Sequence, residues 1–213
     1  MNDILVNLIV LAGVAGLVGL IFLFVMRKQK QEKETLQAFV QQKGWQLEWI
    51  RERLAKGYRI ISAEWMLESV SRSADTESGP GSSNIEKKTT WFCAQPGSTI
   101  LIGPRTSQTN LGPMAEILKA QILQMALGKD AQGISEIIVG SQAFQKSFMV
   151  WAQDEKEANQ LITPSLQSAL LTWMKVPPLI KQTSSGVTIE LNGTYLNKTE
   201  DILRLIQLGE KLL

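Results

Sequence analysis

Residues 4–26 read ILVNLIVLAGVAGLVGLIFLFVM, a run of 23 residues with no charged side chain and a single amide, Asn7. An α-helix rises about 1.5 Å per residue, so a helix of this length reaches about 34 Å. The hydrocarbon core of a bilayer is about 30 Å thick. We therefore expect residues 1–26 to form one transmembrane anchor.

A cleaved signal peptide is the alternative interpretation of this segment. Signal peptides begin with basic residues and end at a cleavage site of small residues. This chain begins Met1-Asn2-Asp3, and the apolar run ends Leu23-Phe24-Val25-Met26-Arg27-Lys28. These flanks favour an anchor that is retained.

The charges beside the apolar run predict its orientation. Asp3 precedes the run, and a basic juxtamembrane segment, residues 27–34, follows it with four cations: Arg27, Lys28, Lys30 and Lys33. Cations collect on the cytoplasmic side of membrane helices. We therefore expect a single-pass protein of the cell membrane with its larger part in the cytoplasm. These cations could also touch anionic lipids, but Glu32 and Glu34 dilute the charge and favour the topology signal.

Small residues recur at intervals of four within the run. Ala12 and Gly16 form one such pair, and Ala15 and Gly19 form another. This spacing lets two membrane helices approach closely, which predicts self-association or docking on another membrane helix. The alternative is that Gly and Ala are simply common in membrane helices.

Residues 35–213 are long enough for one soluble domain with its own core. The chain has 22 Lys and Arg against 20 Asp and Glu, so its charge does not indicate nucleic-acid binding. It has no histidine, which removes the commonest general base and metal ligand. Its single cysteine, Cys93, allows no intrachain disulfide and no cysteine-based zinc site. A reducing compartment fits this composition.

Hydrophobic periodicity and turn signals divide the domain into short elements. Alternating residues predict strands at 45–49, 58–70, 85–94, 98–102, 134–139, 148–152 and 187–191. Apolar stripes and capping residues predict helices at 32–42 and 112–127, after Asp154, after Thr163-Pro164, and at 199–212. Residues 51–56 are predicted to be a helical or irregular link. Asn192-Gly193 is a hairpin signal, and a return strand is expected from Tyr195.

The order of these elements predicts the fold class. Hairpins come early and helices late, without the regular alternation that a parallel sheet requires. We expect an α+β domain behind the transmembrane helix, with a mainly antiparallel sheet packed on one face with helices. The segment 148–152 would be apolar on both faces as a strand, which predicts a strand that is central or covered.

Two features of the domain leave alternatives open. Residues 71–84 are rich in Ser, Gly, Asp and Pro and predict a flexible loop, either a ligand-facing loop or, as we favour, an extended hairpin. Six tryptophans are present, and they predict either a Trp-rich core or an aromatic groove for a peptide or lipid. They are Trp45, Trp49, Trp65, Trp91, Trp151 and Trp173.

Known catalytic motifs are missing from the sequence. It contains no phosphate-binding loop ending in Lys-Ser or Lys-Thr and no Gly-x-Gly-x-x-Gly. It also has no Gly-x-Ser-x-Gly elbow and no Ser-x-x-Lys. We therefore predict no catalytic, cofactor-binding or metal-binding residue and expect the protein not to be an enzyme.

Several segments resemble a family of bacterial single-pass membrane-anchored proteins of unknown activity. They are the Gly44-Trp45 opening, the segment Phe148 to Asp154, the positions Ala158, Leu161 to Pro164, Leu166 and Leu170, and the closing leucine-rich helix. The resemblance covers most of the chain and implies a short anchor and a small α+β domain. Its motifs are apolar and capping positions, so it carries no functional residue across.

These observations lead to three functional hypotheses. The first is a membrane-anchored cytoplasmic domain that binds protein partners as an adaptor, assembly factor or accessory subunit. The second is a domain that binds a small ligand or lipid in an aromatic groove. The third is a histidine-free enzyme.

Overall fold

The computed structural model describes residues 2–74, 84–105, 121, 123–173 and 176–213, and of residues 2–16, 74 and 84 it describes the backbone alone. The strands are β1 (Gln46–Arg51), β2 (Ala55–Ile61), β3 (Trp65–Ala74), β4 (Asn84–Cys93), β5 (Ile100–Pro104), β6 (Ser135–Ile137), β7 (Phe148–Ala152), β8 (Leu179–Thr183) and β9 (Gly186–Asn192). The helices are α1 (Asn2–Gln42), η1 (Gly128–Ala131), α3 (Gln142–Ser147), α4 (Glu155–Leu161), α5 (Pro164–Leu171) and α6 (Thr199–Glu210).

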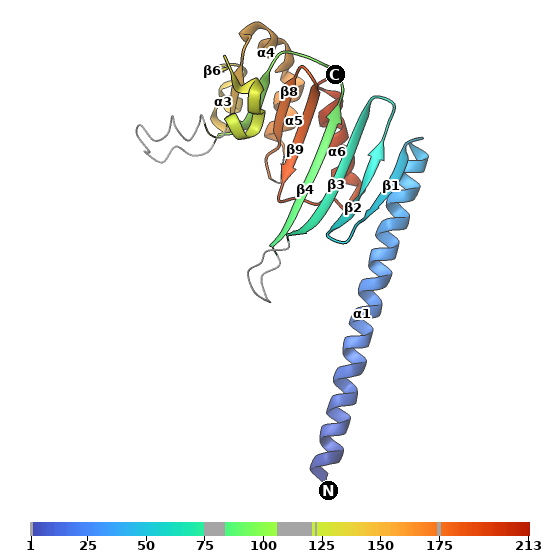
Figure 1. Ribbon diagram of the computed structural model, residues 1–213. Helices are drawn as coiled ribbons and strands as arrows, with labels where there is room; N and C mark the ends of the chain where they lie inside the picture. The colour runs from blue at the N-terminus through green and yellow to red at the C-terminus, as the bar shows by residue number, and fades with distance from the viewer. Residues whose placement is uncertain (1, 75–83, 106–120, 122, 174–175) are drawn as a thin grey trace.

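All nine strands belong to one antiparallel sheet with the order β1-β2-β3-β4-β9-β8-β5-β7-β6 (Figure 1). The strands β1 to β4 follow one another as a meander. Helix α3 connects β6 to β7, and helices α4 and α5 connect β7 to β8, whereas β8 and β9 form a hairpin. The predicted α+β class with a mainly antiparallel sheet is therefore confirmed.

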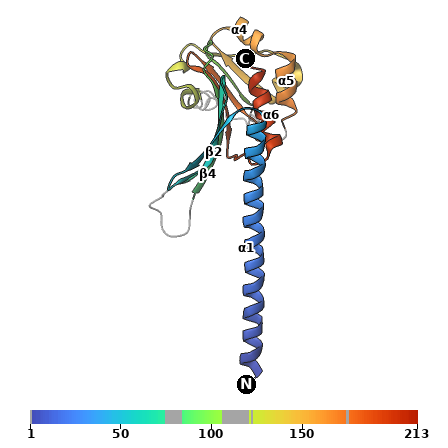
Figure 2. The same cartoon turned by 90° about the vertical axis from the view of Figure 1, so that its right-hand side faces the viewer.

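Helices cover one face of this sheet, as expected. Helix α6, helix α5 and the end of α1 lie together on that face (Figure 2). Trp91 of β4 is fully buried beneath them. Gly209 of α6 lies directly on its indole ring, where a Cβ would overlap the ring. This glycine allows the helix to approach the sheet closely.

The described residues cover the opposite face of the sheet at one end only. A second apolar cluster there contains Leu101, Leu127, Met149 and Trp151. Leu127 precedes η1, and the other three come from β5 and β7. All five residues of β7 are buried, because apolar layers lie on both of its faces. The prediction that residues 148–152 form a covered strand is confirmed.

The uncovered part of the opposite face is held by cross-strand ion pairs. Arg59 of β2 lies between Glu48 of β1 and Glu68 of β3. Its Nη2 is 2.6 Å from Glu68 Oε2, and its Nη1 is 3.4 Å from Glu48 Oε2. The two carboxylates raise the pKa of the guanidinium, chiefly through the hydrogen bond to Glu68.

A second ion-pair group lies further along the same face. Glu190 of β9 is contacted by Lys181 at 2.9 Å and Lys88 at 3.2 Å. Burial disfavours the charged form of the Glu190 carboxyl, but the hydrogen bonds and charges of the two lysines outweigh that effect. They hold the pKa of Glu190 below its ordinary value.

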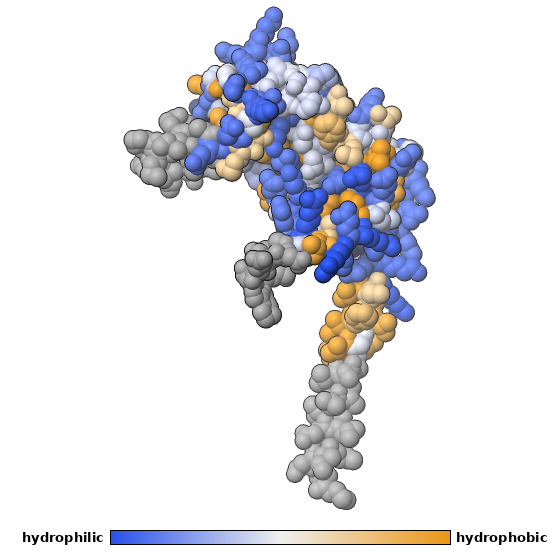
Figure 3. Space-filling view, in the orientation of Figure 1, coloured by the Kyte–Doolittle hydropathy of each residue, from blue (hydrophilic) through white to orange (hydrophobic). Residues whose placement is uncertain are grey.

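Helix α1 runs without a break from Asn2 to Gln42 and projects from the domain (Figures 1 and 2). Leu36 and Val40 are buried where its last turns pack on the sheet. Earlier in the helix the large apolar side chains are exposed, and Figure 3 shows apolar side chains over this part on the face in view: Leu17, Val18, Leu20, Ile21, Phe22, Leu23, Phe24, Val25 and Met26.

The predicted transmembrane run extends beyond the part of α1 whose side chains are described. Those side chains begin at residue 17, whereas the run begins at residue 4. Over the residues described in this way, no helix has the length and apolarity needed to cross a membrane.

The prediction of one long strand over residues 58–70 is wrong, because this segment belongs to two strands, β2 and β3. The chain turns at Ser62, whose backbone N–H donates to the Trp65 carbonyl, and β2 and β3 form an antiparallel hairpin. The residues that face the core change from even-numbered Tyr58 and Ile60 to odd-numbered Trp65 and Leu67. A single strand cannot make that change without a break.

Several other boundaries also differ from the predictions. Residues 51–56 are not a helical link but the end of β1, a tight turn and the start of β2. No strand begins at Tyr195, because β9 forms its hairpin with β8. Strand β8 and helix α3 were not predicted. Of the predicted flexible loop, residues 71–74 and 84 lie in strands, and residues 75–83 lie outside the described residues. Most of the predicted helix 112–127 also lies outside them.

Candidate functional site

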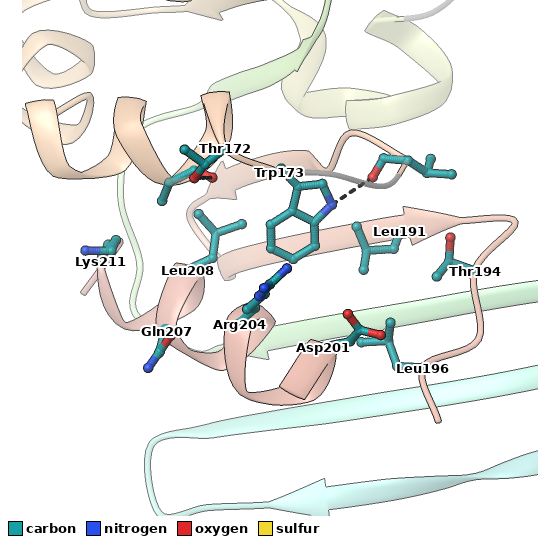
Figure 4. A pocket seen from close by; sticks show the side chains of 12 residues that line it. Thr172, Trp173, Leu191, Thr194, Leu196, Asp201, Arg204, Gln207, Leu208 and Lys211 are labelled. Atoms are coloured by element: carbon teal, nitrogen blue, oxygen red, sulfur yellow. Dashed lines mark hydrogen bonds between the residues drawn. The ribbon is translucent and has the colours of Figure 1, made fainter. Parts of the chain in front are cut away.

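A pocket of about 400 Å³ opens between the end of α5, the end of β9 and helix α6 (Figure 4). Ligand sites in proteins usually measure about 300 to 1,000 Å³. Its lining is half apolar and half polar: Ala169, Thr172, Trp173, Val176, Leu191, Thr194, Leu196, Asp201, Arg204, Gln207, Leu208 and Lys211. Residues 174 and 175, next to this lining, lie outside the described residues.

Trp173 forms the wall of the pocket. It follows α5, whose start is fixed by Thr163, since the Thr163 hydroxyl accepts a hydrogen bond from the Leu166 N–H at 3.2 Å. Pro164 occupies the first helical position, as predicted. The indole N–H of Trp173 donates to the Val176 carbonyl at 3.0 Å. The indole is thereby oriented, and its ring presents an apolar surface to the pocket (Figure 4).

The floor of the pocket consists of three leucines from different elements. Leu191 lies in β9, Leu196 lies in the segment that leads to α6, and Leu208 lies in α6. All three are buried against the main core. The floor is therefore part of the packed interior and is rigid.

The rim of the pocket carries charge from α6. Arg204 and Lys211 lie two turns apart on its exposed side, with Gln207 between them. Lys211 also donates to the Ser165 hydroxyl on α5. Asp201 belongs to the same lining, so the rim has two cations and one carboxylate. The pocket can accept an apolar group that has an anionic group beside it.

Buried polar contacts fix the segment that carries Leu196. The Tyr58 hydroxyl donates to the Leu196 carbonyl at 2.7 Å, and the Leu196 N–H donates to the Ser69 hydroxyl at 3.0 Å. The Thr89 hydroxyl lies 2.9 Å from that of Ser69 and donates to the Thr194 carbonyl at 2.9 Å. Burial raises the pKa of Tyr58 strongly, with a smaller contribution from neighbouring Tyr195, so Tyr58 stays a neutral donor.

A second groove, of about 250 Å³, lies between α1 and the sheet. Its lining is aromatic and polar: Gln29, Glu32, Lys33, Leu36, Trp49, Tyr58, Tyr195 and Asn197. The Lys33 ammonium lies 5.7 Å from the centre of the Trp49 ring. Burial raises the pKa of Tyr195, and the nearby Glu32 charge adds to the shift.

The predicted membrane-helix residues fall into two groups. Gly19 is exposed, and a Cβ there would meet no atom within 4 Å. The side chains of Ala12, Ala15 and Gly16 lie outside the described residues. The predicted packing between membrane helices stays a prediction.

The four predicted basic residues Arg27, Lys28, Lys30 and Lys33 are all exposed on α1. The Lys30 ammonium lies 3.8 Å from Glu34 one turn later. The structure brings Lys33 to the sheet, but Arg27, Lys28 and Lys30 precede the turns that pack on the domain.

The tryptophans lie in two kinds of surroundings. Trp65, Trp91 and Trp151 are buried in the apolar clusters, whereas Trp49 lines the groove beside α1 and Trp173 lines the pocket beside α6. The residues of α6 that surround this pocket were not predicted. An exposed Arg or Lys on an amphipathic helix is ordinary, so the only available signal was the coincidence of Trp173 with the proline-rich end of α5.

Among the residues that the structure describes, no group of three or more His, Cys, Asp and Glu side chains could hold a metal ion. The chain matches no protein-family model, no curated protein and no solved structure. The resemblance to bacterial membrane-anchored proteins therefore stays a prediction.

Proposed function

We propose that this protein is a membrane-tethered binding domain, with α1 as its anchor and the pocket under Trp173 as its binding site for a protein partner. It acts as an adaptor, assembly factor or accessory subunit. Tethering raises the effective concentration of the domain near membrane partners, so even a small binding site is sufficient.

The exposed apolar side chains of α1 support the anchor. The residues from Leu17 to Met26 are exposed at consecutive helical positions, so they surround the helix axis, and no other element described in the structure covers them. A helix that is apolar on all sides is stable only inside a large core or a membrane. The uncharged sequence continues back to Ile4, which gives the run the length of a span.

The pocket has a rigid apolar floor enclosed by a polar and cationic rim, and the proposed binding role rests on this arrangement. Protein interfaces have the same anatomy, with a desolvated apolar centre, a polar rim, and Trp and Arg enriched among the residues that dominate affinity. The partner segment that fits places an apolar side chain on Leu196 and Leu208 and a carboxylate beside Arg204.

Crosslinking in cells tests this binding site. A photoreactive amino acid replaces Gln207 on the rim of the pocket in the full-length chain. We expect a discrete protein adduct that Arg204→Glu reduces at least tenfold, because reversing one charge-assisted contact costs more than about 1.4 kcal/mol. A photoreactive residue at the exposed Lys156 of α4, and the charge-matched variant Lys156→Glu, are the controls. Equal adducts from both positions, or no effect of Arg204→Glu, would contradict the proposal.

A small amphiphile is the second candidate, because the pocket volume lies within the range of ligand sites. Native mass spectrometry of the full-length chain decides between the two. A bound molecule of constant mass that Arg204→Glu removes supports the amphiphile. The chain without any added mass supports the protein partner.

The orientation of the anchor needs a separate test. Leu213 ends the chain on the opposite side of the domain from the N-terminus (Figure 1), and it is exposed, so a reporter can be fused to it without disturbing the core. We expect activity from a reporter that works in the cytoplasm and none from one that works outside. The reverse result would contradict the positive-inside prediction.

A further inference from the structure

We propose that the free end of the β1–β4 meander binds the surface of the membrane in which α1 is anchored, through anionic phospholipid headgroups. We call this end the sheet tip and define it as Arg51 to Lys56, Ser71 to Ser73 and Ile85 to Lys87. The inference rests on the proposed anchor, and it adds a second contact between the domain and the bilayer.

A row of cations crosses the sheet tip. Arg51 of β1 pairs with Lys56 of β2, Lys56 pairs with Ser71 of β3, and Ser71 pairs with Lys87 of β4. Directly opposed residues in antiparallel strands point to the same face. Three of these four adjacent strands therefore each place one cation on the same face, and all three cations are exposed.

The cations of this row lack carboxylate partners among the described residues. On the opposite face of the same strands, Arg59 is paired with Glu48 and Glu68. Like charges placed opposite each other across strands destabilise a sheet. The row lowers the stability of the sheet and leaves its charges exposed. It is therefore suited to binding an anionic surface outside the molecule.

Two exposed apolar side chains lie beyond the cations, at the extreme end of the sheet. Leu54 is 41% exposed and Ile85 is 56% exposed. Ile85 pairs with Ser73, whose N–H donates to the Leu54 carbonyl at 2.8 Å, so the two side chains belong to neighbouring strands of one edge. Proteins that insert into the interfacial region of a bilayer have this pattern, with apolar residues at the inserted end and cations behind them.

The geometry of α1 brings this edge to the height of the membrane. Strand β1 turns back along α1, so that Trp49 lies level with Lys33. From there Arg51 lies about 7 Å further along the strand. Arg27, where the apolar part of the helix ends, lies about 9 Å further along α1. The free end of strands β2 to β4 points toward the N-terminal side of α1 (Figure 2).

The cationic row also faces the helix side of the sheet. It continues the face of Trp49 and Tyr58, which line the groove with Lys33 of α1. The polar part of α1 and the sheet tip therefore lie on the same side of the sheet, in one basic region. Because α1 is a continuous helix packed by Leu36 and Val40, the domain cannot turn this region away from the bilayer without unpacking.

The test uses the full-length chain reconstituted in vesicles, with a fluorescent label on Ser73→Cys. The native Cys93 is buried, and unsubstituted protein serves as its labelling control. Lipids that carry a quencher near the headgroup report contact with the label. We expect strong quenching in phosphatidylcholine with a third of phosphatidylglycerol, and weak quenching in phosphatidylcholine alone. Removing three cations, each worth roughly fivefold, should lower the contact equilibrium about 100-fold.

The test variant is Arg51→Gln, Lys56→Gln and Lys87→Gln together. The matched control removes three exposed cations from the opposite end of the molecule: Lys129, Lys146 and Lys156. Loss of quenching in the test variant alone supports the proposal. Equal quenching in both lipid mixtures, or in both variants, overturns it.

Failure of the anchor gives a different result. If α1 does not span the bilayer, alkaline carbonate extracts the unsubstituted chain from the vesicles whatever their lipid composition. If the chain resists extraction and the label is nevertheless unquenched, the anchor stands and only the sheet-tip proposal is overturned.

Discussion

The two faces of the sheet are stabilised by different interactions, although alternate residues of the same strands supply both. On the helix-covered face, Trp91 is packed beneath Gly209 and Tyr58 joins a buried hydrogen-bond network. On the open face, Arg59 and Glu190 belong to ion-pair groups that water reaches. The first face depends on shape, so its stability should respond to volume, and the second depends on charge, so its stability should respond to pH and salt.

The sheet tip belongs to neither kind. It continues the helix-covered face beyond the end of the helices, and it carries cations without carboxylate partners among the described residues, where the covered face carries apolar groups. The proposed membrane contact rests on this difference. Substitutions in the three regions should therefore change the free energy of unfolding by different amounts.

The covered face should be most sensitive at Gly209. In Gly209→Ala the new methyl group overlaps the fully buried indole of Trp91, which cannot move aside. Overpacking costs about 1 to 3 kcal/mol, against roughly 1 kcal/mol gained in helix propensity. Because the overlap is with a rigid ring, we expect a net loss of about 2 kcal/mol. Denaturant unfolding of the full-length chain in detergent, followed by tryptophan fluorescence, measures it.

Glu210→Ala is the control for that variant. Glu210 is the next residue of α6 and is exposed, so its substitution should change stability by less than about 0.5 kcal/mol. Equal stability of the two variants would show that α6 does not pack on Trp91 as described.

The buried network should be the next most sensitive. Tyr58→Phe removes the donor to the Leu196 carbonyl and leaves that carbonyl buried without its partner. Such a loss costs about 1 to 3 kcal/mol, and we expect about 1.5 kcal/mol. Hydrogen exchange of residues 194–196 should also accelerate, because this segment loses one of its anchors. Tyr195→Phe, at a half-buried ring, is the comparison and should leave that exchange unchanged.

The open face should depend on pH through Glu190. Its pKa in the folded state is lowered from the ordinary value of 4.5, so the folded state favours the carboxylate more than the unfolded chain does. The resulting stability is present above that ordinary value and is lost as pH falls through the lower folded value. We expect Glu190→Gln to cost about 1 kcal/mol or less at pH 7 and nothing in strong acid.

Thermal unfolding of both proteins across pH 2 to 7 measures this effect. A difference that stays constant over this range would contradict an electrostatic role for Glu190. Added salt should narrow the difference at neutral pH, because the pair is partly exposed to water.

The sheet tip should show the smallest effect, with the opposite sign. Replacing Arg51, Lys56 and Lys87 by Gln relieves repulsion between unpaired cations, so it should stabilise the detergent-solubilised chain by about 0.5 kcal/mol or less. Denaturant unfolding at low salt measures it. A clear destabilisation would mean that these cations have structural partners, which would weaken the case for a membrane contact.

Local signals in the sequence were sufficient where one segment decides its own structure. Asp154 accepts hydrogen bonds from the Lys156 and Glu157 N–H groups and starts α4, and Thr163 starts α5, both as predicted. The prediction for α6 placed Ile202, Leu205, Ile206 and Leu212 on its inner face, and all four are buried. The helix begins at Thr199, but Thr199 is its first residue and not its cap, and Lys198 before it makes no side-chain cap.

The predictions failed where a strand's limits depend on its neighbours. Residues 58–70 look continuous because nearly every position is compatible with a strand, and only the pairing of β2 with β3 shows where the hairpin turns. Strand β8 (Leu179–Thr183) was not predicted, because the two prolines before it were interpreted only as the end of a helix. The pocket beside Trp173 was also not predicted, since Trp173, Leu196 and Arg204 meet only after α5, β9 and α6 have packed.

Local patterns account for the long uncharged apolar run, the antiparallel α+β class and the starts of α4 and α5, because periodicity and capping act over a few neighbouring residues. Tertiary packing fixes which residues share a surface. Arg51 and Lys87 stand in one row, and Leu196 and Arg204 line one pocket, through strand register and helix packing between distant segments. Long-range contacts fix that register, and no local pattern contains them.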